Sequence, residues 1–192
     1  MRCKYWALFV LSLFSVFSLR AQGVDEISPM AIYNVALVGC DSAGSELVKL
    51  FVSTGEARCV ALFDKDSRMA EQAKAEIESV QSKAPERYDD YMQMLDRRDV
   101  DILLLVVPAE QCEEFFLKAC EYDKNMYVEI PPAFPSDRLK RLIEASRKMS
   151  GAVQAGEFTK RADTTERIKN LLYYLDGRAD TLAYPLESLE KR

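Results

Sequence analysis

Apolar residues in this chain gather in short continuous runs, which alternate with longer segments of helical composition or spacing. Each run is followed by a glycine, an acidic residue or a proline: 33–38, 59–63, 100–107, 126–128 and 152–155. The segments between them predict helices over 43–52, 67–80, 90–95, 110–121 and 136–149. Continuous apolar runs are typical of strands covered on both faces. The alternation therefore predicts an α/β fold with a doubly wound parallel sheet, Rossmann-like, of about six strands.

The same pattern divides the chain into four regions. Residues 1–22 are predicted to be a signal peptide, 23–32 a flexible leader, 33–161 a Rossmann-like dinucleotide-binding domain and 162–192 a C-terminal helix and tail. In the helix predicted over 164–175, one apolar stripe comprises Ile168, Leu171, Leu172 and Leu175. That stripe either folds back on the sheet or docks a protein partner. The tail after Gly177 is short and polar, so no second catalytic domain is expected.

The first 22 residues combine a basic start, an apolar run and a small residue near the end. Arg2 and Lys4 precede the apolar residues 5–19, and Ala21 offers a site for cleavage. This arrangement predicts a secretory signal peptide and export to the periplasm or the extracellular space. The alternative is an uncleaved membrane anchor, although the run is shorter than the roughly 20 residues that span a bilayer. After cleavage, no stable membrane span is expected.

Composition excludes several classes of function. The sequence contains no histidine, which excludes Ser-His-Asp and Cys-His catalysis and every histidine-ligated metal site, and no metal is expected. The net charge of −5 becomes −8 after cleavage at Ala21, because three basic residues and no acidic one are removed. No basic stretch is long enough to follow phosphates, so nucleic-acid binding is disfavoured. Cleavage would leave four cysteines, Cys40, Cys59, Cys112 and Cys120. The alternatives for them are a Cys40–Cys112 disulfide and buried free thiols.

The first strand is followed by a turn similar to a dinucleotide-binding motif. In that motif, G-x-G-x-x-G, the glycines allow a tight turn, close approach of a pyrophosphate and close helix packing. Here the turn is Gly39-Cys40-Asp41-Ser42-Ala43-Gly44, with Asp41 in place of the second glycine. Asp64 ends the second strand, where an acidic side chain can accept hydrogen bonds from a ribose. The alternative is a sheet of this class whose first turn needs glycines but binds no nucleotide.

Asp41 is expected to weaken dinucleotide binding. Two unit charges 4 Å apart interact by roughly 4 kcal/mol at an effective dielectric of 20, whereas the dipole of the following helix contributes only about 0.3–1 kcal/mol. Repulsion of a diphosphate therefore dominates unless Asp41 turns to water or caps the helix, a position that favours aspartate. The sequence leaves the capping role and the ligand role of Asp41 as alternatives.

Further motifs follow the turn in a fixed order. They are Tyr88-Asp89-Asp90-Tyr91, Asp99-Val100-Asp101 before an apolar strand ending in Pro108, Tyr127-Val128-Glu129-Ile130-Pro131, and Gln154-Ala155-Gly156. Together with the glycine turn they make residues 33–161 resemble the nucleotide-binding half of the glucose-fructose oxidoreductase / inositol dehydrogenase / rhizopine-catabolism (Gfo/Idh/MocA) family. The resemblance implies an NAD(P)-dependent oxidoreductase that acts on sugars or polyols.

The resemblance also implies positions for the cofactor. Around the pyrophosphate it places Gly39, Cys40, Asp41, Ser42 and Gly44. It places Asp64 at the adenosine ribose, and Pro108 and Glu129 near the nicotinamide. An acid at position 64 favours an unphosphorylated ribose, and NAD or NADP is the expected cofactor.

Departures from the family pattern bear on activity. Family members carry Glu-Lys-Pro after the fifth strand, where the lysine helps to hold substrate and steer proton transfer. Here the triplet is Glu129-Ile130-Pro131, and an isoleucine cannot exchange a proton. The histidine after the Pro108 position and the substrate-binding domain are also missing from the pattern. We therefore expect a degenerate binding or interaction module with a weakened dinucleotide site and no catalytic residue. The alternative is an active oxidoreductase that works with a separate substrate-binding subunit.

Overall fold

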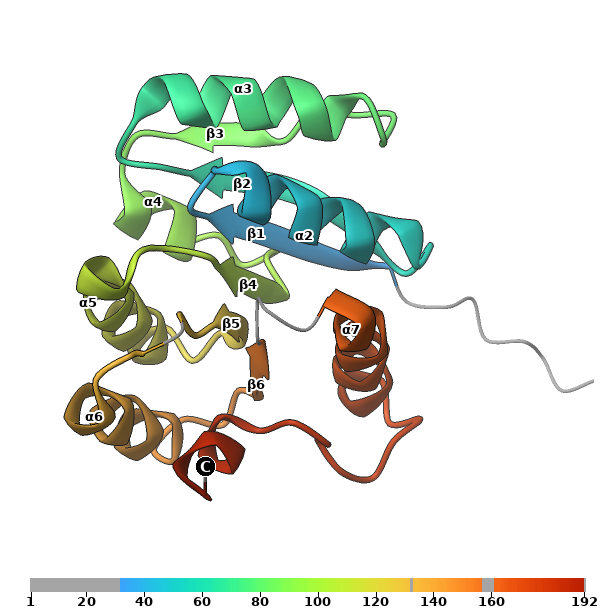
Figure 1. Ribbon diagram of the computed structural model, residues 1–192. Helices are drawn as coiled ribbons and strands as arrows, with labels where there is room; N and C mark the ends of the chain where they lie inside the picture. Colours follow the sequence, from blue (N-terminus) through green and yellow to red (C-terminus); the bar gives the residue numbers. More distant parts are fainter. Residues whose placement is uncertain (1–31, 132, 157–160, 192) are drawn as a thin grey trace, which may run out of the picture. The chain divides into compact units, whose positions relative to one another are not determined.

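The computed structural model describes residues 32–131, 133–156 and 161–191. The predicted signal peptide and all but the last residue of the predicted leader lie outside these residues. The described residues form a parallel sheet with helices on both of its faces (Figure 1). This arrangement confirms the predicted doubly wound, Rossmann-like α/β class.

The sheet has the strand order β3-β2-β1-β4-β5-β6, and every neighbouring pair is parallel. The strands are β1 Tyr33–Val38, β2 Ala57–Phe63, β3 Glu86–Tyr88, β4 Ile102–Leu105, β5 Asn125–Glu129 and β6 Val153–Gly156. The strand order reverses between β1 and β4. In open α/β sheets, ligands bind at this reversal, outside the carboxyl ends of the strands.

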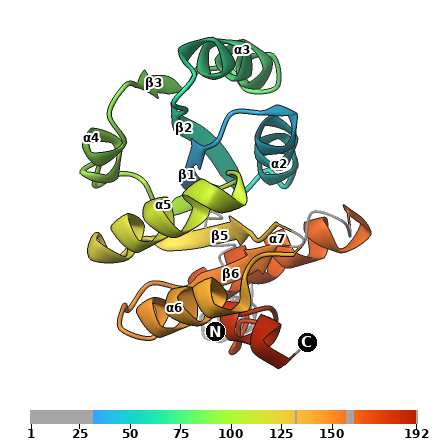
Figure 2. The same ribbon diagram turned by 60° about the vertical axis from the view of Figure 1, so that its left-hand side comes forward.

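Helices cover the sheet in two layers. They are α2 Ser42–Ser53, α3 Ser67–Glu78, α4 Tyr91–Leu95, α5 Ala109–Glu121, α6 Ser136–Ser146 and α7 Arg161–Leu175, followed by a 3-10 helix, Leu186–Lys191. Apolar residues of α2, α3 and α7 pack on one face of the sheet, and those of α4, α5 and α6 pack on the other (Figure 2). Strands between two such layers need apolar residues on both sides, which accounts for the continuous runs in the sequence.

Helix α7 packs on the sheet through its apolar stripe. Ile168, Leu171 and Leu172 are completely buried and belong to the same apolar cluster as Tyr127 on β5. Burial of each such aliphatic side chain contributes about 1.5–3 kcal/mol to stability. Of the two alternatives for the stripe, folding back on the sheet is therefore the one observed. A protein partner that docks through the helix over 164–175 stays a prediction.

The predicted elements differ from the observed ones mainly at the sheet edge and at strand ends. Strand β3 was not predicted, because its three residues are partly exposed and form no apolar run. The apolar run 100–107 contains β4, but Val106 and Val107 continue beyond the strand and line the cavities described below. Helix α3 is capped by Asp66, whose Oδ1 accepts a hydrogen bond from the backbone N–H of Arg68 at 2.9 Å.

The four cysteines among the described residues are free thiols. The sulfur atoms of Cys40, Cys59, Cys112 and Cys120 are unbridged. Cys40 packs with α2 on one face of the sheet, whereas Cys112 packs into the core on the other face. The hypothesis of a Cys40–Cys112 disulfide is therefore wrong, because the sheet separates the two side chains.

Candidate functional site

The strand register brings the first-turn residues and the ends of the neighbouring strands to one edge of the sheet. Val38, the last residue of β1, pairs with Phe63 on β2 and with Leu105 on β4. The register continues in step from β4 through β5 to β6. Gly39 and Asp64, which directly follow β1 and β2, therefore lie side by side at the carboxyl edge of the sheet.

The two glycines of the first turn are required by close packing of the backbone. Gly39 has a φ of +91°, and a Cβ there would lie 1.7 Å from the carbonyl oxygen of Val106. A Cβ at Gly44 would lie 2.1 Å from the carbonyl oxygen of Gly39. Both contacts are far too short for a side chain. The turn therefore needs glycine at these positions whether or not a nucleotide binds. The two glycines alone thus do not distinguish a nucleotide site from a sheet whose first turn only needs glycines.

Asp41 caps helix α2, which was one of its two predicted roles. Its Oδ1 accepts a hydrogen bond from the backbone N–H of Gly44 at 2.9 Å, and its carbonyl oxygen accepts from Ser45 at 3.0 Å. Its backbone is extended, as is usual for a capping residue. The carboxylate therefore stands at the positive end of the helix, where these motifs place an anion.

Asp64 ties the end of β2 to the first turn. Its Oδ2 accepts a hydrogen bond from the backbone N–H of Cys40 at 2.7 Å, and its Oδ1 accepts from Asp66 at 2.8 Å. A carboxylate has about four acceptor positions, so two hydrogen bonds leave capacity for the hydroxyls of a ribose. The side chain is half-buried at the sheet edge, where the sequence placed it.

Two cavities meet at this edge. One, of about 160 Å³, is bordered by Gly39, Asp64, Lys65 and Phe115. The other, of about 220 Å³, is bordered by Ala43, Glu129, Ile130 and Pro131. Both cavities share the same four residues, Asp41, Val106, Val107 and Pro108. We call the two adjoining cavities the edge groove; it runs past the reversal in strand order, with Asp41 at its middle.

Glu129 is a buried carboxyl at the far end of the edge groove. The residue is only 7% exposed, and burial raises the pKa of its carboxyl to about 7. The guanidinium of Arg167 and the hydroxyl of Tyr127 lower this pKa, but by less than burial raises it. Gly156 makes room for the carboxyl, since a Cβ there would lie 2.5 Å from Oε1 of Glu129. The carboxyl therefore keeps its proton to a higher pH than an exposed glutamate does.

Lys65 and Phe115 border the groove, although neither was among the predicted site residues. Nζ of Lys65 lies 4.9 Å from the centroid of the Phe115 ring and 3.5 Å from Oε2 of Glu114. Lys65 directly follows Asp64, so its place could have been inferred from the sequence. Phe115 lies on α5, and only the fold brings it to the groove. A cation beside an aromatic face offers a surface on which a flat base can stack.

The structure gathers most of the predicted cofactor residues around the edge groove. Five of the predicted residues line the groove: Gly39, Asp41, Asp64, Pro108 and Glu129. Cys40 does not line it, because its side chain is 2% exposed and its thiol approaches the carbonyl oxygen of Phe63 at 3.5 Å. Ser42 is exposed in the first turn of α2, and Gly44 is buried beneath that turn.

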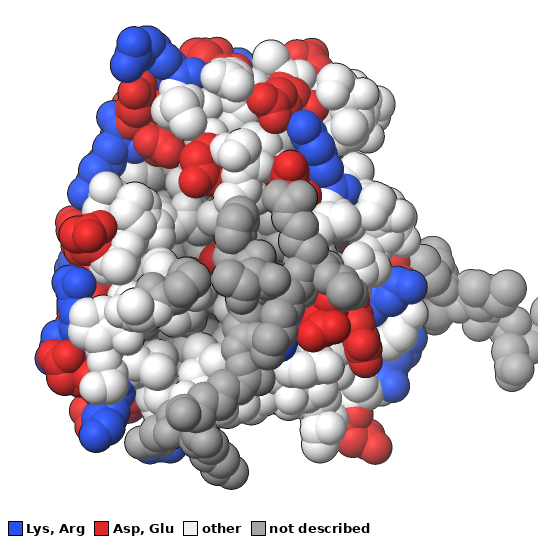
Figure 3. Space-filling view, viewed as in Figure 1, with Lys and Arg blue, Asp and Glu red and all other residues white. Residues whose placement is uncertain are grey.

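The surface shows no preference for one sign of charge on the visible face. In Figure 3, lysine and arginine side chains are interspersed with aspartate and glutamate side chains. Within the described residues, no group of three or more Cys, Asp and Glu side chains lies close enough together to hold a metal ion.

Comparison with known proteins gives the site a family context. Residues 33–157 match the model of the oxidoreductase family with an NAD-binding Rossmann fold, GFO_IDH_MocA. The chain is 30% identical over 118 residues to a glycosyl hydrolase family 109 protein of Streptomyces niveus, covering 59% of this chain and 24% of that protein. It is 27% identical over 131 residues to inositol 2-dehydrogenase 2 of Saccharopolyspora erythraea, covering 68% of this chain and 37% of that protein. The chain thus spans well under half the length of these relatives.

Solved structures show the same fold. The myo-inositol dehydrogenase of Lactobacillus casei, solved with NAD(H) and myo-inositol, matches with a TM-score of 0.58 and 24% identity. The match covers 65% of this chain and 36% of that one. An NAD-binding oxidoreductase of Klebsiella pneumoniae matches with a TM-score of 0.57 and 20% identity, over 66% of this chain and 34% of that one.

Proposed function

Because the chain belongs to the Gfo/Idh/MocA family of oxidoreductases, we propose that it is an exported module that binds a nicotinamide dinucleotide weakly and catalyses no reaction alone. The edge groove supports dinucleotide binding. Asp64 has acceptor capacity for a ribose, Phe115 offers a face for a base, and an apolar recess lies between Pro108 and Pro131. The ligand that these features suit is NAD or NADP.

One observation carries the proposed weakness of binding: the carboxylate of Asp41 already occupies the amino end of α2. The N–H of Gly44, which a pyrophosphate would use, donates to Oδ1 of Asp41. Asp41 also borders both halves of the edge groove, where a diphosphate would connect the two nucleosides. The opposing Coulomb energy is at most roughly 4 kcal/mol for unit charges 4 Å apart at an effective dielectric of 20. Because Asp41 is exposed, solvent screening reduces it further.

The proposed lack of catalysis rests on the nicotinamide end of the groove. Ile130 borders that end, at the position where the family pattern expected from the sequence has a lysine, and its side chain can neither donate nor accept a proton. The relatives named for activity on glycosides or inositol are much longer than this chain. The match covers 24% and 37% of those relatives, so contacts to a substrate would come from outside the matched region.

Titration of the mature chain with NADH and NADPH, followed by calorimetry, tests the proposal. We expect NADH to bind with a Kd weaker than about 100 μM, which corresponds to less than about 5.5 kcal/mol of binding free energy. We also expect no NADH formation when NAD and a polyol are added to the chain alone. Polyol oxidation by the isolated chain would contradict the proposed lack of catalysis. Absence of any heat at millimolar NADH would contradict dinucleotide binding.

The alternative, an active oxidoreductase with a separate substrate-binding subunit, is favoured by one observation. Glu129 borders the nicotinamide end, and burial raises its pKa to about 7, a value suited to proton transfer at neutral pH. A tagged chain isolated from its native host together with bound proteins should then oxidise a polyol with NAD, whereas the chain alone should not. Inactivity of both preparations would rule against this alternative.

The proposed export is supported by the basic start and apolar run of residues 1–22. In the part of the chain that the structure describes, no helix is both long and apolar enough to cross a bilayer. Expression with the native leader, followed by amino-terminal sequencing of the exported protein, tests cleavage. We expect the mature chain to begin close to Gln22, and an intact Met1 in the membrane fraction would support the anchor instead.

A further inference from the structure

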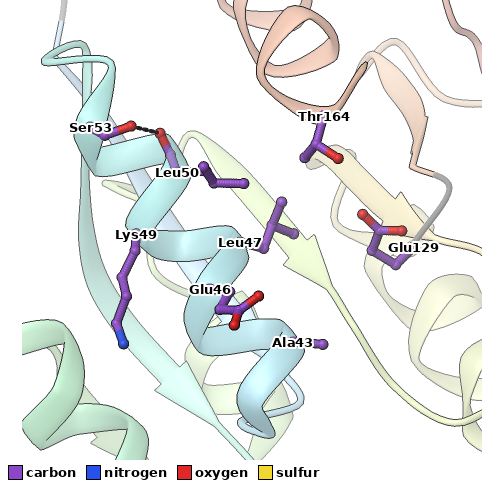
Figure 4. A pocket seen from close by; sticks show the side chains of 8 residues that line it. All are labelled: Ala43, Glu46, Leu47, Lys49, Leu50, Ser53, Glu129 and Thr164. Atoms are coloured by element: carbon purple, nitrogen blue, oxygen red, sulfur yellow. Dashed lines mark hydrogen bonds between the residues drawn. The ribbon is translucent and has the colours of Figure 1, made fainter. Parts of the chain in front are cut away.

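Two cavities outside the edge groove differ in how they relate to it. One lies between α2 and α7, bordered by Leu47 and Thr164, and Glu129 connects it with the edge groove (Figure 4). It therefore extends the dinucleotide site. The other has a volume of about 300 Å³ and lies at the opposite edge of the sheet, where β2 begins. We call it the amino-edge cavity; it shares no lining residue with the edge groove.

The amino-edge cavity forms because β2 extends beyond β3. Strand β3 begins at Glu86, which pairs with Ala61, so the first four residues of β2 lie beyond this pairing. Gln81 bonds to the strand there: its Oε1 accepts from the N–H of Cys59 at 3.0 Å, and its Nε2 donates to the carbonyl oxygen of Cys59 at 2.8 Å. The same Nε2 donates to the carbonyl oxygen of Lys83 at 2.5 Å. The loop that borders the cavity is therefore fixed to β2 before any ligand binds.

Arg97 holds two carboxylates at the cavity. Its guanidinium donates to both carboxylate oxygens of Asp99, at 2.7 and 2.9 Å, and to Oε2 of Glu86 at 3.1 Å. All three side chains border the cavity. A carboxylate has about four acceptor positions, so Asp99 and Glu86 both keep capacity for the hydroxyl groups of a ligand.

Two further cations border the cavity without an acidic partner. Arg58 donates from Nε to the amide oxygen of Asn34 at 2.7 Å, and among the described residues its other two nitrogens have no partner. Nor does any ion pair within the described chain include Lys83. The lining thus holds three cations and two carboxylates, which gives it a net charge of +1 in a chain whose net charge is −5. A ligand with one negative charge would balance it, and the planar guanidinium suits a carboxylate.

We propose that the amino-edge cavity binds a small hydroxylated carboxylate of the hexuronate type. The carboxylate lies between Arg58 and Lys83, and hydroxyl groups donate to Glu86 and Asp99. The site is remote from the edge groove, since a strand rises roughly 3.3 Å per residue and Arg58 to Phe63 therefore span roughly 16 Å. The proposal goes beyond dinucleotide binding and does not depend on it. A failed NADH titration would leave it intact, and its own failure would leave dinucleotide binding intact.

Two sugars of nearly the same shape test the role of the charge. Glucuronate carries a carboxylate at C6 where glucose carries a hydroxymethyl group. Binding to the full mature chain at low ionic strength is measured by chemical-shift changes in two-dimensional NMR. We expect glucuronate to bind with a Kd on the order of 1 mM and glucose at least about tenfold more weakly. Equal binding of the two sugars, or no glucuronate binding, would overturn the proposal.

Two further probes test the hydroxyl groups and the single charge. Acetate has the carboxylate without the sugar hydroxyls and should bind at least about tenfold more weakly than glucuronate. Glucose 6-phosphate carries nearly two negative charges, which the net charge of the lining does not balance, so it should bind no more tightly than glucuronate. Acetate binding equal to that of glucuronate, or tighter binding of glucose 6-phosphate, would contradict the assigned ligand class.

Matched variants test the location. Arg58→Gln and Lys83→Gln should each weaken glucuronate binding at least about fivefold, whereas Lys140→Gln, at an exposed position on α6, should leave it unchanged. Arg58 and Lys83 are exposed, so neither variant should disturb folding. In the unmodified chain, the largest shift changes should fall on residues 58–60 and 81–84. Unchanged affinity in both cavity variants, an equal loss in Lys140→Gln, or shift changes centred on residues 39–44 would each overturn the assignment.

Discussion

Replacing Glu129 by glutamine should change how the stability of the fold depends on pH. Burial raises the pKa of the Glu129 carboxyl from 4.5 to about 7, and Arg167 and Tyr127 offset only part of this effect. Glutamine has nearly the same shape as the protonated acid and does not titrate. The variant therefore removes the ionisation while keeping the packing against Gly156.

The sign and size of the effect follow from proton linkage. Between pH 4.5 and 7 the native chain holds a proton that the unfolded chain has released, so the free energy of unfolding falls as pH rises through this window. Each pKa unit corresponds to 1.36 kcal/mol, which gives a loss of about 3 kcal/mol above pH 7. Below pH 4.5 the carboxyl is protonated in both states and contributes no pH dependence.

Urea unfolding of both proteins at pH 4.5, 6 and 8 measures this difference. We expect the stability of Glu129→Gln relative to the unmodified chain to rise by about 3 kcal/mol between pH 4.5 and 8. Glu144→Gln, at an exposed position on α6, serves as the control and should show no such trend. A relative stability that stays constant with pH, or that falls, would refute the reasoning.

Three further experiments test the packing of the fold. Gly39→Ala should lower the free energy of unfolding by more than about 2 kcal/mol, since its Cβ would collide with the Val106 carbonyl. Gly55 also has a positive φ but faces open space, so Gly55→Ala should lower the free energy of unfolding by only about 1–2 kcal/mol. Leu171→Ala should lower the free energy of unfolding, measured in urea, by about 2–5 kcal/mol because the side chain is completely buried. The control, Lys169→Ala on the exposed side of α7, should lower it by less than about 0.5 kcal/mol. Burial raises the pKa of Cys59 and Cys112 to about 12, so iodoacetamide at pH 8 should leave both unmodified in the native chain, and the unfolded mature chain should show four thiols by mass spectrometry. Fewer than four would indicate a disulfide.

The fold could be predicted from the sequence because its central strands are all buried between two layers of helices. Strands β1 and β4 lie between two helix layers, and their residues 35–38 and 102–105 are all apolar and buried. Strand β3 was not readable for the opposite reason. It pairs only with β2, at the edge of the sheet, and its residues Glu86–Tyr88 are partly exposed. No apolar pattern distinguishes such a segment from a loop.

Residues of the site could be predicted from the sequence only where their position follows from the neighbouring residues in the chain. Gly39 and Asp64 were identified because they directly follow strands in a recognisable order. The capping role of Asp41 depends on the direction of its side chain, which sequence does not specify. The burial of Glu129 depends on Gly156 and on helix α7, which come much later in the chain. Long-range packing of this kind leaves no local pattern.

The central claim is that the charge of Asp41 limits dinucleotide affinity in a groove that is otherwise intact. Asparagine caps helices as well as aspartate does, so Asp41→Asn removes the charge and keeps the hydrogen bond to Gly44. In a calorimetric titration with NADH at low ionic strength, this variant should bind at least about tenfold more tightly than the unmodified chain, or about 1.4 kcal/mol. Equal affinities of the two proteins for NADH would contradict the claim.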